Sequence, residues 1–568
     1  MGLFSHLALL GAFATLGLGQ DCPIFGPAYP QIVDPGSATA FIEAKTAIED
    51  EISKGISSGQ LDNGTVFAIQ VFSRHSDEIL HEHYYGPSIG PDTVFRLASI
   101  SKLMSVYTTL AELGDGYWND PITKHVPELA RLKVQNPVYD VDWSEVTLGA
   151  IAGHMGGIPR DYALGDVSAL IPEGTPGLPA LNETEQIQCG NINVRPCTRE
   201  ETFAMISKSF PIAPSDHTPA YSNMAFQLLS YAVEGITGKK FSTLVDKNLI
   251  QALNLTRTFL SPPINDTNAV VLEAWDWDFG EEAPGGGYLS TAHDLTHLGR
   301  SILRSTLLPP PTTRRWLAPI THTARTTLSV GRPWEIARLA LPISVSPPSN
   351  TTRVTDVYSK QGSIGQYQSL LALSPDHGVG YAMLIGGEGA AGTYGFLQGV
   401  LDRVWLGAAE QAGREEVGGR FAGEYKVAGG DNGEEGEAVV ELRVVDDEPG
   451  LFVQRWVNDG VDLLEFLGGA GLGPQGARLG AWLYPMGLEG GGKVAFRAAF
   501  GAMGVPAGET CASWGSLDLA KYGGKSADLL IFELGEDGKA VAVEVPVLRK
   551  TFRRVGSDGE KCKVKKQY

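Results

Sequence analysis

Two β-rich runs that lie far apart in the chain constrain its fold most strongly. One is Thr65 to Phe72 (TVFAIQVF), with Ile79 to Tyr85 as its expected hairpin partner, and the other is Val379 to Gly386, preceded by Leu370 to Leu373. Strands at both ends with helices between them favour an α+β layer domain whose sheet is completed by both ends of the domain. The expected helices are Ser37 to Ile56, Ser99 to Leu113 and Met224 to Thr237.

A chain of 568 residues is too long for one hydrophobic core, so two or more domains are expected. The composition shifts near residues 408–418, beyond which glycine clusters separate short strand-like runs. We expect a first domain over residues 20–408, a linker over residues 409–417 and a smaller all-β barrel- or sandwich-like domain over residues 418–568. Its strand-like runs are Ala438 to Val445, Leu451 to Val457, Val494 to Phe500, Leu529 to Leu534 and Val541 to Leu548.

Hydrophobic residues make up 43% of the chain and charged residues 19%, which is typical of a folded protein and not of a disordered one. The formal net charge of -20 disfavours nucleic acid and anionic membrane surfaces as partners, because both attract basic proteins. The charge does not indicate a substrate, and the oligomeric state stays open.

The first residues, MGLFSHLALLGAFATLGLGQ, predict a secretory signal peptide over residues 1–19 and therefore an extracellular protein. Their apolar stretch, Leu7 to Leu18, is too short to span a bilayer, and the alternative is an N-terminal membrane anchor. No later apolar run is long enough for a membrane span. Five Asn-x-Ser/Thr sequons agree with export and a glycosylated surface: Asn63, Asn182, Asn254, Asn265 and Asn350.

The chain has five cysteines. Cys189 and Cys197 are close enough in sequence to close a small disulfide loop, Cys511 and Cys562 could pair in the C-terminal region, and Cys22 is left over. The sequence alone does not fix the pairing. No pair has Cys-x-x-Cys spacing, which argues against a structural zinc site.

A Ser-x-x-Lys motif, Ser99 to Lys102, lies at the start of the second expected helix. Apolar residues at Ile100, Leu103, Met104, Tyr107 and Leu110 predict a helix with one buried face. Ser99 then lies in the first turn, and Lys102 projects from the same side three residues later.

This pairing provides what a serine nucleophile needs. A hydroxyl must lose its proton as it attacks, and a lysine can accept that proton only where burial or a second cation favours its neutral form. The backbone N–H of Ser99 at the helix N-terminus can contribute to an oxyanion hole. The alternative is a helix start with an incidental lysine, so the motif needs further support.

Two further motifs supply that support. Tyr221-Ser222-Asn223 precedes a helical run, and Lys360-Gln361-Gly362-Ser363 leads into strands. With Ser99 and Lys102 they resemble the three-motif active site of the serine β-lactamase and penicillin-binding-protein superfamily. The tyrosine motif is similar to that of the class C β-lactamase, D-alanyl-D-alanine carboxypeptidase and esterase branch.

The stretches Thr147 to Arg160 (TLGAIAGHMGGIPR) and Gly285 to Leu303 also resemble segments of that branch, so the likeness extends over about Val33 to Ala408. The C-terminal β domain resembles those appended to secreted fungal β-lactamase-like proteins. The likeness implies an α+β, β-lactamase/transpeptidase-like fold: an antiparallel sheet flanked by helices plus an all-helical subdomain.

The resemblance implies three catalytic residues. Ser99 is the nucleophile that forms an acyl-enzyme, and Lys102 takes or relays its proton. Tyr221 lies within reach of both and passes a proton to the leaving group. No metal or organic cofactor is implied.

The resemblance also implies four substrate-binding residues. Asn223 positions the substrate by hydrogen bonding, and Lys360 supplies positive charge on the edge strand. Gly362 lets the substrate backbone approach closely, and the N–H of Ser363 is the second oxyanion donor. Read singly, Tyr221 could instead be a core tyrosine, Asn223 a helix cap and Lys360 a solvated lysine on an edge strand.

Two positions depart from the family pattern. Gln361 stands where β-lactamases typically have a threonine, whose hydroxyl helps hold a β-lactam carboxylate, and Gly156 stands where the family usually has serine. We therefore expect a secreted serine hydrolase acting on small esters, amides, D-amino-acid peptides or β-lactam-like substrates. The alternatives are an acyltransferase on the same scaffold that makes a secondary metabolite, and a catalytically inactive secreted binding protein.

Four other patterns are not expected to carry chemistry. Gly55 to Gly59 matches the nucleophile-elbow pattern Gly-x-Ser-x-Gly, but it follows a helix and precedes a strand, the reverse of the required context. Gly471 to Gly476 lacks the βαβ unit of a dinucleotide site. His81-Glu82-His83 lacks further metal ligands, and Ser215-Asp216-His217 is contiguous, unlike a triad.

Overall fold

The computed structural model describes residues 23–556 except 170, 172–173, 183–184, 192–193, 428–435, 447, 473–477 and 504–512. The predicted signal peptide, Cys22, Cys511 and Cys562 lie outside the described residues, as does most of the Gly471–Gly476 loop. None of the helices among the described residues is long and apolar enough to cross a membrane.

The chain forms two compact units, and each is assembled from separate stretches of sequence. The larger comprises Lys45–Leu339 and Asp356–Leu401. The smaller comprises the described residues up to Ala44, Ala340–Thr355, and those from Asp402 onward. The predicted boundary near residue 408 did not anticipate that the smaller unit draws on two earlier segments.

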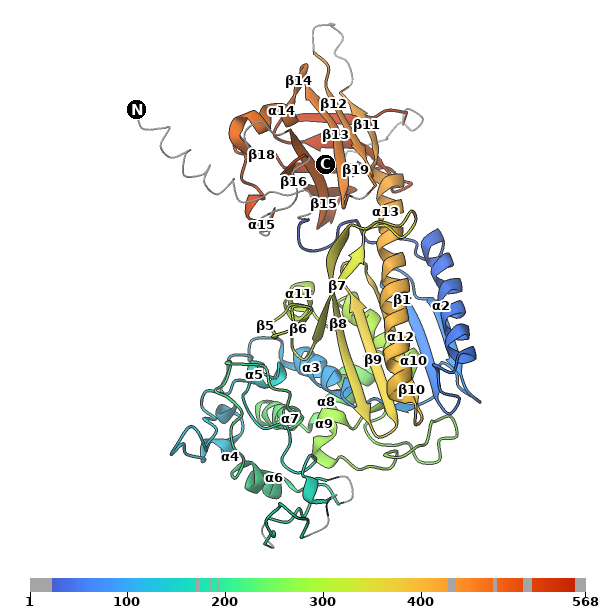
Figure 1. Cartoon of the computed structure of the whole chain (residues 1–568). Helices are drawn as coiled ribbons and strands as arrows, with labels where there is room; N and C mark the ends of the chain where they lie inside the picture. Colours follow the sequence, from blue (N-terminus) through green and yellow to red (C-terminus); the bar gives the residue numbers. More distant parts are fainter. Residues whose placement is uncertain are drawn as a thin grey trace. The chain divides into compact units, whose positions relative to one another are not determined.

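An eight-stranded antiparallel sheet is the centre of the larger unit, with strand order β2-β1-β10-β9-β8-β7-β6-β5 (Figure 1). The first strands therefore pair with the last strand, as predicted, and Val66 of β1 lies opposite Gly386 of β10. The strands are β1 (Val66–Ser73), β2 (Ile79–Tyr85), β5 (Thr321–His322), β6 (Leu328–Val330), β7 (Glu335–Pro342), β8 (Thr352–Ile364), β9 (Tyr367–Ser374) and β10 (Val379–Gly386).

Both faces of this sheet are covered. Every residue of β9 and β10 is buried, which requires packing on each side of the sheet. α10 (Ala292–Leu303) packs against β1, β9 and β10, and α12 (Ala390–Val400) packs against β9 and β10. Figure 1 shows α12 in front of the sheet together with α2 (Thr39–Ser57).

Between β2 and β5 the chain is mainly helical, and this region forms the predicted helical subdomain. A two-stranded ladder, β3 (Phe95–Arg96) with β4 (Leu289–Ser290), lies at its base. The helices are α3 (Ile100–Leu113), η1 (Ile122–Lys124), α4 (Pro127–Ala130), α5 (Leu148–Ala152), η2 (Val167–Ala169), α6 (Arg199–Ile206), α7 (Met224–Thr237), α8 (Phe241–Val245), η3 (Asp246–Gln251), η4 (Gly280–Glu282), α9 (Ala283–Gly286) and α11 (Pro310–Trp316).

Helix α3 is buried on all sides, whereas the sequence pattern predicted one buried face. Ile100 to Leu110 are all buried, including the polar residues of the face expected to be solvated. Those polar side chains find partners in the segment that contains α9: the Ser101 hydroxyl accepts from the Tyr288 backbone N–H at 3.0 Å, and the Ser105 hydroxyl donates to the Pro284 carbonyl at 2.9 Å. The polar face of α3 is therefore an internal docking surface for that segment.

The smaller unit contains a closed eight-stranded barrel, which resolves the choice between barrel and sandwich. Its sheet has the order β12-β11-β21-β20-β19-β16-β15-β13-β14, and an additional β12–β13 pairing closes the ring and leaves β14 attached outside it. Phe421, Phe496 and Phe532 pack with ring centroids 5.0 to 5.1 Å apart in its core. The strands are β11 (Gly423–Lys426), β12 (Val439–Arg443), β13 (Leu451–Asn458), β14 (Val461–Asp462), β15 (Leu479–Gly490), β16 (Lys493–Ala502), β19 (Leu529–Leu534), β20 (Ala540–Val545) and β21 (Lys550–Arg554).

The remaining elements of the smaller unit are short, apart from one helix. Residues 409–417, predicted as a linker, lie inside α13 (Leu406–Phe421), which is helical throughout. The short elements are η5 (Leu401–Trp405), α14 (Leu463–Leu467), η6 (Gly468–Leu472), α15 (Ser513–Ser516), β17 (Lys521–Tyr522) and β18 (Lys525–Ser526).

Candidate active site

Ser99 lies at a sharp turn that leads from strand β3 into helix α3. The residue before it, Ala98, has a φ of 46°, in the left-handed region that side chains rarely adopt. Ser99 is the N-cap residue of α3, but its side chain makes no capping hydrogen bond. The hydroxyl is therefore left for other partners at a helix N-terminus, where the helix dipole favours negative charge.

Lys102 lies one turn further along α3 and is completely buried. Its Nζ donates to Ser99 Oγ at 3.0 Å and to the Gly285 carbonyl. Burial lowers the pKa of Lys102 below its ordinary value; Tyr221 opposes this shift and the charge of Lys360 adds to it. Lys102 is thus a buried amine that can accept a proton at Ser99.

Tyr221 approaches the same oxygen from the segment before α7. Its hydroxyl donates to Ser99 Oγ at 2.8 Å. Burial would raise the pKa of Tyr221, but the charges of Lys102 and Lys360 outweigh it, so the pKa lies below its ordinary value. The structure therefore brings Ser99, Lys102 and Tyr221 together, and Tyr221 is not simply a core tyrosine.

Lys360 lies on β8, which is an interior strand of the sheet between β9 and β7, so the predicted edge-strand position is wrong. Its side chain is only 1% exposed, which also rules out a solvated lysine. Nζ pairs with the Glu335 carboxylate at the first residue of β7 and donates to the Gln361 carbonyl at 2.9 Å. Burial would lower the pKa of Lys360, but Glu335 and Tyr221 outweigh it and raise the pKa.

Gly362 is required by the packing of β8 against the start of α3. A Cβ at this position would lie 2.1 Å from the Leu97 carbonyl oxygen, 2.4 Å from Ser369 Oγ and 2.9 Å from the Ser99 backbone nitrogen. The glycine thus lets β8 reach the Ser99 backbone, where the predicted oxyanion hole lies. Ser363 follows on β8 with an exposed side chain, whose Oγ accepts from Gln368 Nε2 at 2.8 Å.

Asn223 occupies the N-cap position of α7 but forms no side-chain capping bond. Its amide instead donates to both carboxylate oxygens of Asp161, at 2.9 and 3.2 Å. Burial raises the pKa of Asp161, and the Asn223 hydrogen bond offsets part of that rise. Asp161 therefore orients Asn223, a role that sequence reasoning missed.

His154 packs against the ring of Tyr221. The two rings stack with centroids 4.2 Å apart and an interplanar angle of 22°. Burial, together with the charges of Lys360 and Lys102, lowers the pKa of His154 well below its ordinary value, so the ring is neutral. Its Nδ1 accepts from the Ser222 backbone N–H at 3.1 Å, which fixes the ring beside Tyr221.

Two of the patterns not expected to carry chemistry, Gly55 to Gly59 and His81 to His83, have other surroundings. Gly55 to Gly59 spans the end of α2 and precedes β1, the reversed context that was predicted. His81 and His83 both lie close to Glu49, at 3.1 and 3.0 Å. Within the described ranges, no group of three or more histidine, cysteine, aspartate or glutamate residues is arranged to hold a metal ion. Cys189 and Cys197 form a disulfide, which confirms that proposed pair.

Four groups of the cluster were not identified from the sequence: Asp161, His154, Glu335 and the Gly285 carbonyl. His154 and Gly285 lie within the two stretches, Thr147 to Arg160 and Gly285 to Leu303, whose resemblance had been noted. Asp161 directly follows the first of these stretches. Glu335 carries no local signal, because its importance comes from the pairing of β7 with β8.

Comparison with known proteins identifies two regions. A family model described as "Beta-lactamase" matches residues 59–395, and one described as "Beta-lactamase-like-like, C-terminal domain" matches residues 413–556. A "Beta-lactamase-like protein" of Arthroderma benhamiae is 28% identical over 554 residues, which cover 89% of this chain and 90% of the relative. A "Probable hydrolase" of a Phoma species is 26% identical over 490 residues, covering 81% of this chain and 76% of the relative.

Among solved structures, a penicillin-binding protein homologue from Pyrococcus abyssi, titled as octameric, is similar with a TM-score of 0.47 and 15% identity. The likeness covers 89% of this chain and 98% of that chain.

Proposed function

The chain belongs to the beta-lactamase family, and we propose that it is a secreted serine hydrolase that acts through an acyl-enzyme on Ser99. The family consists of serine hydrolases that act on small ester, amide or peptide substrates. The observation that carries the proposal is that a single oxygen, Ser99 Oγ, receives hydrogen bonds from both Lys102 and Tyr221. Both of those groups have pKa values below their ordinary values.

In the proposed acylation step, Ser99 Oγ forms a bond to the substrate carbonyl carbon and gives its proton to the Lys102–Tyr221 pair. The negative charge on the carbonyl oxygen is stabilised by the backbone N–H groups of Ser99 and Ser363. Tyr221 then gives a proton to the leaving oxygen or nitrogen as its bond to the carbonyl carbon breaks.

Deacylation reverses these roles with water as the nucleophile. Water loses a proton to the Lys102–Tyr221 pair and bonds to the acyl carbon. The bond to Ser99 Oγ then breaks, and the proton returns to that oxygen. Lys360, held positively charged by Glu335, remains a fixed cation beside Tyr221 throughout this cycle.

Small esters, amides and D-amino-acid peptides are the proposed substrates, ahead of β-lactams. Gln361 replaces the threonine whose hydroxyl holds a β-lactam carboxylate in typical family members. Its backbone N–H donates to Glu335 at 2.9 Å, and its side-chain amide approaches Gln368 at 3.5 Å. An amide in this setting does not reproduce the hydroxyl donor, so we expect weak β-lactam hydrolysis.

The positions of the sequons support the proposal of secretion. Asn63, Asn182, Asn254, Asn265 and Asn350 are all exposed, so a glycosyl group can be attached at each without disturbing the core. Treatment of the secreted protein with an N-glycosidase is expected to reduce its mass.

The first experiment compares the wild type with Ser99→Ala by intact mass after brief exposure to a p-nitrophenyl ester and, separately, to a cephalosporin. We expect an acyl adduct, or release of p-nitrophenol where deacylation is fast, from the wild type alone. The matched control is Ser57→Ala, which removes the exposed serine of the rival Gly-x-Ser-x-Gly pattern and is expected to behave like the wild type.

Hydrolysis that persists in Ser99→Ala would contradict the proposal. Loss of hydrolysis in Ser57→Ala would instead indicate that Ser57, the serine of the Gly-x-Ser-x-Gly pattern, is the nucleophile. Adding an alcohol or amine acceptor to the wild-type reaction tests the acyltransferase alternative: water as the dominant acceptor is expected, and efficient transfer would overturn simple hydrolysis.

A further inference from the structure

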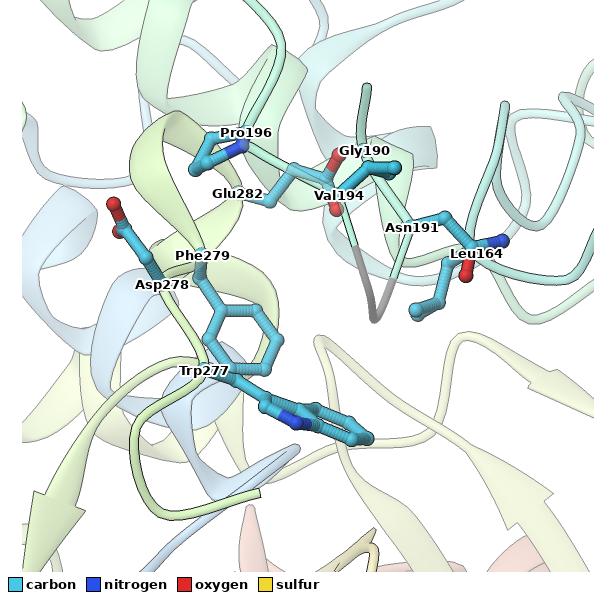
Figure 2. Close-up of a pocket in the computed structure, with 9 residues that line it drawn as sticks. All are labelled: Leu164, Gly190, Asn191, Val194, Pro196, Trp277, Asp278, Phe279 and Glu282. Carbon is cyan, nitrogen blue, oxygen red and sulfur yellow. The ribbon is translucent and has the colours of Figure 1, made fainter. Parts of the chain in front are cut away.

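A pocket lies between a disulfide-closed loop and the turn that leads into α9 (Figure 2). It encloses about 360 Å³, including space open to solvent. The Cys189–Cys197 bond closes the loop, and Gly280 of the turn lies against Pro196 of the loop. The pocket is lined by Leu164, Gly190, Asn191, Val194, Pro196, Trp277, Asp278, Phe279 and Glu282.

The pocket adjoins the Ser99 cluster through two short connections. Glu282 ends η4, three residues before Gly285, whose carbonyl accepts from Lys102. On the other wall, Asp161 holds Asn223, and the adjacent Tyr162 is hydrogen-bonded to Glu282. The pocket wall is therefore joined by short stretches of chain to two groups of the Ser99 cluster, the Gly285 carbonyl and Asp161.

The pocket lining is divided about equally between apolar and polar surface. Figure 2 shows the rings of Trp277 and Phe279 on one side of the pocket and the Glu282 carboxylate directed toward the loop at Gly190 and Val194. The Asp278 carboxylate points away from these rings, and it accepts from the Gly280 backbone N–H at 2.9 Å. The lining thus combines aromatic faces with one inward carboxylate, the pair of features that favours an organic cation.

Glu282 lacks a cationic partner. No arginine or lysine in the described part of the chain forms an ion pair with it, and Lys102 acts on it only at a distance. Residues 273–282 contain five carboxylates and no lysine or arginine. Burial raises the pKa of Glu282 to about 7; the Tyr162 hydrogen bond and Lys102 lower it, while Asp161 raises it further. A bound cation would restore the electrostatic stabilisation that this carboxylate has lost.

We propose that this pocket is a substrate subsite that selects a protonated amine carried on a short apolar or aromatic group, with Glu282 binding the ammonium and Trp277 and Phe279 its apolar body. The inference rests on the proposed function of Ser99, because it assigns a substrate class to that site. It narrows the substrates from small esters, amides and peptides in general to those that carry an amine.

The test uses pairs of p-nitrophenyl esters of several chain lengths, in which one member has an ammonium group and the other a methyl group in its place. We expect the full-length wild type to prefer the ammonium ester in kcat/KM. In Glu282→Gln that preference should fall by at least about tenfold, because the amide keeps the shape and loses the charge. The matched control is Glu281→Gln, whose carboxylate accepts from Tyr231 and which should keep the preference.

A wild type without the preference, or a Glu282→Gln variant that keeps it, would overturn the subsite. If Ser99-dependent hydrolysis of the methyl esters persists in that case, the proposed hydrolase function stands. If Ser99 proves inactive toward every ester, calorimetric binding decides: full-length Ser99→Ala should bind benzylammonium more tightly than benzyl alcohol, and adding Glu282→Gln should remove the difference. Equal binding of the two probes would refute the subsite independently of catalysis.

Discussion

Lys102 and Lys360 lie beside the same tyrosine, Tyr221, and their pKa values shift in opposite directions. Lys102 and Lys360 both have their Nζ 5.1 Å from the centroid of the Tyr221 ring, and both are buried. Only Lys360 has a carboxylate partner, Glu335, so its pKa rises while that of Lys102 falls. Glu335 thus accounts for the difference between the two lysines: Lys360 remains a fixed cation, whereas Lys102 can accept a proton.

This asymmetry predicts how the pH profile responds to Glu335→Gln. Glu335 raises the pKa of Tyr221, so removing its charge lowers that pKa further at every pH at which Lys360 keeps its proton. Catalysis requires a deprotonated member of the Lys102–Tyr221 pair, and activity therefore rises with pH through the pKa of that pair. The ascending limb of kcat/KM for a neutral ester should move to lower pH in Glu335→Gln.

The matched control for this measurement is Glu388→Gln, at an exposed carboxylate outside the cluster, which should leave the ascending limb in place. A Glu335→Gln profile that coincides with the wild type would show that Glu335 does not tune the pair. A shift to higher pH would contradict the assigned sign.

At the scale of elements, the close approach of β8 to α3 is the feature on which the site depends. Gly362→Ala places a methyl group against the Leu97 carbonyl and the Ser99 backbone nitrogen, so β8 has to move away from the nucleophile. We expect a loss of about 100-fold or more in kcat/KM with a stability loss of roughly 1–3 kcal/mol. Steady-state kinetics and thermal unfolding measure the two effects.

Gly395→Ala on α12 is the control for that substitution, because a Cβ there meets no atom within 4 Å. It should preserve activity and stabilise the helix by up to about 1 kcal/mol. An active Gly362→Ala enzyme would mean that the contact between β8 and α3 is not needed for the geometry of the site.

Elements with a strong local pattern were predictable from the sequence. The predicted bounds of α7, β10 and β19 coincide with the structure, because their apolar periodicity and their terminating residues agree. Strand β8 was expected at Lys360 only from the family resemblance, and its extent was not predicted, because TRVTDVYSKQGSI places buried polar residues where a strand pattern requires apolar ones. The glycines and charges of α13 similarly suggested a linker, and tertiary packing overrides that weak local preference.

The site residues also divide into those that a local pattern predicts and those that only tertiary contacts determine. The Ser-x-x-Lys spacing predicts that Ser99 and Lys102 share a helix face, because helix geometry alone decides it. The partners Glu335 and Asp161 depend on contacts between segments far apart in sequence, and no local pattern encodes those contacts. The burial of the polar face of α3 has the same origin.

At the scale of the whole molecule, a buried ion pair links separate stretches of the smaller unit. Arg353, from the segment Ala340–Thr355, pairs with Glu410 of α13 through two hydrogen bonds of 2.7 Å. Their side chains are 3% and 0% exposed. Tyr29, from the N-terminal stretch, packs in the core of the same unit. The barrel region therefore depends on residues that lie well before it in the sequence.

Removing one member of this pair should be costly. Arg353→Ala leaves Glu410 buried without its main cation, and we expect a loss of about 3–5 kcal/mol in the stability of this unit. Arg353→Met combined with Glu410→Leu should recover most of the loss, since the buried charge is then absent. Hydrogen exchange of peptides from residues 402–556, followed by mass spectrometry, reports the stability of the unit by region.

Arg455→Ala provides the comparison, because the Arg455–Glu437 pair is exposed to solvent and its loss should change the stability of the unit far less. Equal effects of Arg353→Ala and Arg455→Ala would show that the buried pair does not hold the smaller unit together.

The pairing of β1 with β10 also determines the order of events during synthesis. β1 ends at Ser73 and its partner begins at Val379, so at about 5–20 residues per second the ribosome needs about 15 to 60 s to deliver that partner. During this interval the apolar strand VFAIQVFS can pair with β2 but lacks its second neighbour in the sheet, β10. A sugar added at Asn63, three residues upstream of β1, would arrive early enough to protect the nascent chain from aggregation.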